Sequence, residues 1–137
     1  MNRSDTDMND PPIATRTMWK THPCPDERAA LSLTDTHTPA EFARITAGFI
    51  PQEMDDKWFV FFEAPWLYFH RSWTGFCIYG VRLESSSKGA TVVESWVSRN
   101  NDQYRKAQTD YEQQLLKRLI DGLLLGRAVP LPKPRRV

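Results

Sequence analysis

The sequence predicts an α+β fold: a four-stranded antiparallel β-meander with a short N-terminal helix and a long C-terminal amphipathic helix packed on one face. Three observations support this prediction. Most of the chain's 5 Trp, 4 Tyr and 7 Phe residues lie between Lys57 and Glu84, in segments without helical spacing. A capping pattern at Thr38 indicates one helix. An amphipathic pattern that ends at Gly126 indicates the second, longer helix.

Four segments rich in β-branched and aromatic residues are the expected strands, at residues 58–63, 66–71, 76–84 and 90–98. Proline cannot donate to a β-ladder, so Ala64-Pro65 predicts a hairpin between the first two. Gly75 permits a tight turn before the third strand, and the polar loop at residues 85–89 precedes the fourth. Connections this short make neighbouring strands antiparallel.

Side chains two residues apart in a strand share a face of the sheet. The strand at residues 58–63 is apolar on nearly both faces, which predicts a central strand or one covered twice. The second strand places aromatic side chains with polar tips on one face and core side chains on the other. The two sets are Trp66, Tyr68 and His70, and Leu67, Phe69 and Arg71.

Two helices flank the meander. Thr38-Pro39-Ala40-Glu41 combines a Thr N-cap, a proline at the first helical position and a glutamate that completes a capping box. The helix that begins there is expected to reach about Ala47, before Gly48. The long helix is expected to follow the N-cap candidates Asn100-Asn101-Asp102 and to run to Gly126. Its expected apolar side holds Tyr111, Leu115, Leu116, Leu119, Ile120, Leu123 and Leu124, and its polar side holds Glu112, Gln113, Lys117, Arg118 and Asp121.

Length and charge limit the domain organisation and the class of protein. The 137 residues suit one domain, at 37–126, after an irregular or partly disordered lead-in (1–36) and before a Pro-rich basic tail (127–137). A net charge of +1 argues against binding to nucleic acid through phosphate contacts. No apolar run is long enough to cross a membrane, and the N-terminus lacks a signal-peptide pattern, so a cytoplasmic protein is expected.

Cysteine and histidine patterns give no sign of a metal or cofactor. The 2 cysteines, Cys24 and Cys77, do not make a disulfide framework, and Cys77 within an aromatic strand is expected to be a small buried apolar residue. His22-Pro23-Cys24 supplies two possible ligands without a partner pair, which falls short of a zinc pattern. We therefore expect no metal site and no cofactor.

The segment from His70 to Gly75 is the candidate site, because polar groups at a strand end can converge on a ligand. Arg71 suits a phosphate or carboxylate, and aromatic rings nearby suit a planar ligand. The candidate ligand-binding residues are Arg71, His70, Ser72, Trp73, Thr74, Tyr68 and Trp66. A purely structural alternative has His70 bonded across a strand pair, Arg71 paired with Glu63 or Glu84, and Trp73 closing one end of the core.

The motif from Trp58 to Tyr79 reads W-F-x6-W-L-Y-F-H-R-S-W-T-G-x-C-I-Y. It resembles a segment found in small uncharacterised bacterial proteins. The resemblance implies no activity, catalytic residue or cofactor.

These observations favour a small binding module that engages a protein partner or an anionic, nucleotide-like ligand through an aromatic face and the His70-Arg71 turn. An alternative is a small hydrolase acting on a nucleotide-like substrate, with His70 as general base, Arg71 stabilising charge and Ser72 beside them. A homodimer through the C-terminal helix is a further hypothesis, because Leu123-Leu124-Leu125 is wider than one apolar stripe requires.

Overall fold

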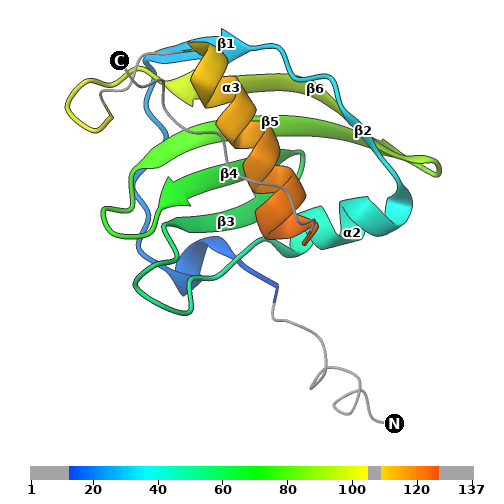
Figure 1. Cartoon of the computed structure of the whole chain (residues 1–137), viewed down its shortest axis with the longest axis horizontal. Helices are drawn as coiled ribbons and strands as arrows, with labels where there is room; N and C mark the ends of the chain where they lie inside the picture. The colour runs from blue at the N-terminus through cyan, green and yellow to red at the C-terminus, as the bar shows by residue number, and fades with distance from the viewer. Residues whose placement is uncertain (1–12, 105–108, 127–137) are drawn as a thin grey trace, which may run out of the picture.

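The computed structural model describes residues 13–104 and 109–126 as one sheet with helices on both sides (Figure 1). The strands are β1 (Arg28–Leu31), β2 (Thr36–His37), β3 (Trp58–Glu63), β4 (Trp66–Arg71), β5 (Cys77–Ser86) and β6 (Gly89–Ser98). The helical elements are η1 (Arg16–Met18), α2 (Pro39–Ala47), α3 (Thr109–Arg118) and the π-helical turn η2 (Leu119–Leu124). None of the described helices is long and apolar enough to cross a membrane.

The sheet has six strands, so the prediction of a four-stranded meander is wrong. The strand order is β1-β6-β5-β4-β3, with β2 also pairing with β6, and each pairing is antiparallel. The two additional strands come from the segment before α2. They were missed because Arg28–Leu31 and Thr36–His37 are short and lack a clear alternation of polar and apolar residues. Their pairing with β6 is a long-range contact that local periodicity does not reveal.

The C-terminal helix is short, so the prediction of a long helix is also wrong. α3 has 10 residues and η2 continues it for 6 more. Asn100 does not begin a helix: its carbonyl accepts hydrogen bonds from the amides of Gln103 and Tyr104 in a tight turn. Two residues assigned to the polar side, Glu112 and Asp121, are buried. The Glu112 carboxylate is held by Arg99, with the closer nitrogen–oxygen distance at 2.7 Å.

The helix α2 confirms the local reading of the sequence around Thr38. The Thr38 hydroxyl accepts a hydrogen bond from the Glu41 amide, and the Glu41 carboxylate accepts one from the Thr38 amide, each at 3.1 Å. The helix ends at Ala47, and Gly48 follows with a φ of 72°. A Cβ at Gly48 would lie 2.2 Å from the Val60 carbonyl oxygen, so close packing against β3 also requires glycine here.

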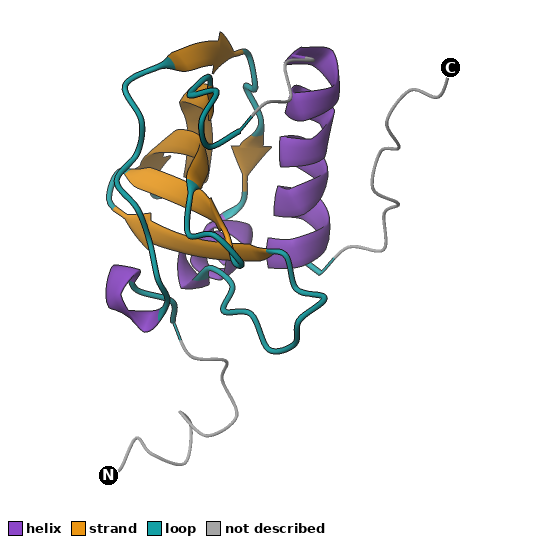
Figure 2. Ribbon diagram, turned by 90° about the vertical axis from the view of Figure 1, so that its left-hand side faces the viewer, coloured by secondary structure: helices purple, strands orange, loops and turns teal. Residues whose placement is uncertain are grey.

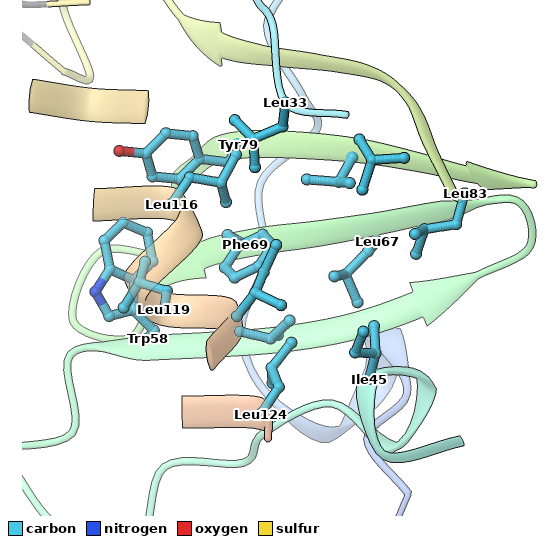
Figure 3. Close-up of a cluster of buried hydrophobic side chains, with 14 of the residues drawn as sticks. Leu33, Ile45, Trp58, Leu67, Phe69, Tyr79, Leu83, Leu116, Leu119 and Leu124 are labelled. Carbon is cyan, nitrogen blue, oxygen red and sulfur yellow. The ribbon is translucent and has the colours of Figure 1, made fainter. Parts of the chain in front are cut away.

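The main core lies between one face of the sheet and the helices α2 and α3 (Figure 3). Side chains of β3, β4 and β5 meet leucines of the C-terminal helix there, with Tyr79 donating its hydroxyl hydrogen bond to the Glu112 carbonyl at 2.9 Å. Leu124 and Leu125 are buried within this core, and Leu123 is only partly buried. Most of this leucine cluster is therefore used inside the chain, which reduces the apolar surface for a homodimer contact. The homodimer through this helix stays a prediction.

The opposite face of the sheet, called here the second face, is covered by the segment at residues 13–27. Figure 2 shows η1 on the side of the sheet away from α3. Ala14, Phe59 and Phe61 form a separate buried cluster on this face, and Trp19 packs on Phe59 with ring centroids 6.3 Å apart. The strand β3 is therefore covered on both faces, one of the two alternatives expected from its composition.

Candidate functional site

His70 and Arg71 lie on opposite faces of the sheet and do not form one turn-end pocket. The His70 ring is only 1% exposed and stacks on Phe61 on the second face, with centroids 5.4 Å apart. Arg71 is half-buried on the helix side, with its guanidinium 5.1 Å from the centroid of the Trp58 ring. Adjacent residues of a strand point to opposite faces, so they cannot grip one ligand together.

The hydroxyl groups of the predicted pocket have structural partners. Ser72 is buried and donates to the Asp56 carbonyl at 2.6 Å, which fixes the loop before β3 to the turn after β4. The Thr74 hydroxyl accepts from the Phe76 amide at 3.2 Å within the same turn. The anion pocket built on Arg71, Ser72 and Thr74 therefore stays a prediction, and both of its hydroxyl groups already bind the backbone.

Trp66 and Tyr68 do share the second face with His70, as strand alternation indicated. Their rings are stacked at an interplanar angle of 13°, with centroids 6.2 Å apart, and Trp66 also lies against Trp96 of β6. Tyr68 packs on Phe61. Both side chains are half-buried, so on this face they contribute to packing and leave only part of each ring accessible.

Trp73 is the predicted residue that remains open to solvent. Its side chain is 57% exposed, its indole N–H donates to the Met54 carbonyl at 3.1 Å, and the Lys57 ammonium lies 4.2 Å from its ring centroid. A cleft of about 740 Å³, called here the Trp73 cleft, lies beside it. The cleft is lined by Trp19, Lys20, Pro51, Gln52, Glu53, Met54, Ser72 and Trp73.

A cluster of two thiols and an imidazole, missed in the sequence, lies under the segment that covers the second face. Cys24 Sγ is 2.7 Å from Cys77 Sγ, and the two sulfurs and a ring nitrogen of His70 all lie within 4.8 Å of one another. His70 and Cys77 are cross-strand partners in β4 and β5, and Cys24 reaches them from the covering segment. The sequence contained only the weak signal of Cys24 in His22-Pro23-Cys24, and His22 is not in the cluster.

The surroundings of the cluster shift the pKa of each member. Burial lowers the pKa of His70, which keeps the imidazole neutral near pH 7. The hydrogen bond from Cys77 lowers the pKa of the Cys24 thiol, and the Arg28 and Arg16 cations lower it further. The same hydrogen bond, together with burial, raises the pKa of Cys77. In the reduced protein, Cys24 is therefore the sulfur that loses its proton first.

A smaller polar hollow of about 240 Å³ lies between β2 and the C-terminal helix. Buried His37 lines it, with Nδ1 3.3 Å from a carboxylate oxygen of Glu41. Lys117 crosses the hollow to bind Asp35 at 2.7 Å, which links the helix to the chain before β2. These contacts hold the C-terminal helix against β2 and the residue before it.

The chain was compared with protein-family models, with curated proteins and with solved structures, and it matches none of them.

Proposed function

We propose that this protein is a small binding module that captures a peptide segment of a protein partner in the Trp73 cleft. The observation that carries the proposal is Trp73 itself, a large aromatic side chain left 57% exposed at the mouth of a cleft. Its indole N–H is already bonded to Met54, so the ring is held in place before a partner arrives. Fixed aromatic side chains of this kind supply much of the affinity at protein interfaces.

The chemistry of the cleft favours an apolar anchor over an anionic ring. Met54 is 75% exposed beside Trp73, and tryptophan and methionine are both enriched at interfaces. One lysine, Lys20, lines the cleft together with the carboxylate of Glu53, so the lining carries no excess of positive charge for a phosphate. Lys57 lies over the Trp73 ring and offers a cation to a nucleotide-like ligand, which is the second candidate.

The hydrolase alternative has less support from the positions of its residues. A general base must reach a substrate water, yet His70 is 1% exposed and stacks on Phe61. Its Nδ1 is bonded to the Gly75 carbonyl at 2.9 Å. Arg71, the proposed charge stabiliser, lies on the other face of the sheet, away from His70.

The test is selection of peptides from a random display library on the full chain, followed by titration of the enriched peptides by fluorescence anisotropy. Trp73→Ala should weaken binding at least about 30-fold, since central interface residues contribute about 2 kcal/mol or more. Val93→Ala is the matched control, because Val93 is a 39% exposed apolar residue on β6 outside the cleft. Equal binding by wild type and Trp73→Ala would contradict the proposal.

A parallel titration with ATP and with AMP distinguishes the second candidate. Saturable quenching of tryptophan fluorescence that Lys57→Gln abolishes, with no peptide enriched by the selection, would reassign the cleft to an anionic planar ligand. Thermal unfolding of Trp73→Ala should differ little from wild type, because the ring is mostly exposed.

A further inference from the structure

We propose that Cys24, His70 and Cys77 form a binding site for a thiophilic metal ion, Cu(I) or Zn(II). Two thiolates and a neutral imidazole are the donor set that such ions prefer in proteins. The site would join the segment at residues 13–27 to strands β4 and β5 on the second face. It is separate from the Trp73 cleft, whose lining includes none of these three residues.

The spacing of the donor atoms fits a single ion. A zinc–sulfur bond is about 2.3 Å and a zinc–nitrogen bond about 2.0–2.1 Å, so two ligands of one ion lie at most about 4.6 Å apart. The ligand atoms of this cluster all lie within 4.8 Å of one another, so a shift of at most about 0.2–0.4 Å brings the widest pair within that limit. The sulfurs, now 2.7 Å apart, must separate to about 3.8 Å in a tetrahedral site. Cys24 is half-buried in a segment without regular structure and can make that movement.

His70 has one ring nitrogen in the state that a metal ligand requires. A carbonyl oxygen only accepts hydrogen bonds, so the 2.9 Å contact between Nδ1 and the Gly75 carbonyl places the ring proton on Nδ1. The lone pair is then on Nε2, which is buried and has no hydrogen-bond partner among the described residues. Metal-binding histidines typically donate their other ring N–H to a carbonyl or carboxylate in this way. An unsatisfied buried nitrogen is otherwise costly, and a metal ion would satisfy it.

The charges around the cluster suit bound thiolates. Arg16 and Arg28 both favour the charged form of Cys24, which is the form that binds metal. Arg28 is held with its guanidinium 4.2 Å from the centroid of the Trp96 ring, and Arg16 donates to Glu63 at 2.9 Å. The Glu63 carboxylate that binds Arg16 acts in the opposite direction, so Arg28 is the main cation that would offset the negative charge of a Cu(I) dithiolate.

The number of ligands favours Cu(I) over Zn(II). Structural zinc sites use four protein ligands, whereas Cu(I) is stable with two thiolates and one imidazole. The cluster contains three residues of the described chain. Zinc would need water or another donor in the fourth position, on the half-buried Cys24 side.

The experiment uses the full chain, reduced and handled without oxygen. Cu(I) is supplied as its coloured bicinchoninate complex, and Zn(II) is followed by competition with a chromogenic chelator. We expect one Cu(I) per chain, with sulfur and nitrogen in its first shell by X-ray absorption. Loss of second-shell groups alone weakens metal sites about 10–100-fold, so Cys24→Ser and Cys77→Ser should each weaken binding at least about 100-fold.

His70→Gln should weaken Cu(I) binding at least about 10-fold, by the same comparison with second-shell losses. His22→Gln is the matched control, because His22 is an exposed histidine near the cluster but outside it, and its affinity should equal that of wild type. Cys77 is fully buried, so its variant is checked for folding by circular dichroism. Half-buried Cys24 provides the second variant if Cys77→Ser unfolds.

Three results would overturn the proposal. These are a reduced wild type that binds neither ion, a Cys24→Ser variant that binds as tightly as wild type, and a His22→Gln variant that loses as much affinity as His70→Gln. If the reduced chain binds neither ion and Cys24 and Cys77 form a disulfide in air, the two cysteines are a disulfide pair and not metal ligands. Tight Zn(II) binding without Cu(I) binding would keep the site and refute the preference for Cu(I).

Discussion

Gly80 provides a sharp test of how the second face is packed. It lies in β5 between Tyr68 of β4 and Trp96 of β6, and a Cβ at this position would lie 2.4 Å from two ring carbons of Trp96. The Trp96 ring is only 4% exposed and cannot swing into solvent. Overpacking a core usually costs about 1–3 kcal/mol, so for Gly80→Ala we expect a loss of about 2–3 kcal/mol in the free energy of unfolding.

Urea unfolding followed by circular dichroism measures this loss. Glu84→Ala, at an exposed position of the same strand, is the control and should stay within about 0.5 kcal/mol of wild type. Combining Gly80→Ala with Trp96→Val removes the clash, so the double variant should be more stable than the sum of the two losses by at least about 1 kcal/mol. A Gly80→Ala protein as stable as wild type, or strictly additive losses, would refute the packing described here.

Two further predictions concern buried ionisable groups. Arg99→Ala should lower the free energy of unfolding by about 3 kcal/mol, the lower end for a broken buried ion pair, because Glu112 is 0% exposed and Arg99 is 24% exposed. A loss below about 1 kcal/mol in urea unfolding would contradict a buried pair. Burial lowers the pKa of His70 in the folded state, so acidification from about pH 6.5 protonates the unfolded chain first and reduces stability. Thermal unfolding in chelator should show this decline between about pH 6.5 and 5, less steeply in His70→Gln than in wild type; the same slope in both proteins would exclude His70 as its source.

The parts of the fold that the sequence predicts well depend on local chemistry. The capping box at Thr38 and Glu41 involves only four consecutive residues, and the helix begins and ends where that pattern and Gly48 indicate. The Ala64-Pro65 turn likewise joins β3 and β4 as the expected hairpin, with Glu63 opposite Trp66. In each case the deciding interactions are between neighbours along the chain.

The errors come from interactions between distant segments. Strand β1 pairs with β6 across a separation that no local pattern marks. The pattern places Glu112 on the polar side of the helix, because its partner Arg99 lies outside the helix, directly after β6. Asn100 is a residue type that favours the N-cap position, but here its side chain accepts a hydrogen bond from the Asp102 amide and closes a turn. Tertiary contacts decided these positions against the local signal.

The candidate site was only partly predictable. Alternation along β4 correctly separates His70 from Arg71, so the grouping of both residues in one pocket contradicted the pattern itself. Trp73, a candidate ligand-binding residue, is 57% exposed, whereas the Ser72 and Thr74 hydroxyl groups hydrogen-bond to the backbone. Cys24 could not be connected with Cys77 without knowing that the segment at residues 13–27 folds over the second face.

The placement of that segment is the central claim, because it forms the cysteine–histidine cluster and one wall of the Trp73 cleft. Nuclear Overhauser effects between ring protons test it directly in solution. Trp19 should show contacts to Phe59, and His22 should show contacts to Phe76, whose ring centroid lies 5.1 Å away. The backbone amide of His22, which donates to the Gly75 carbonyl at 2.8 Å, should be protected from hydrogen exchange. Absence of these contacts, with unprotected amides across residues 13–27, would contradict the account.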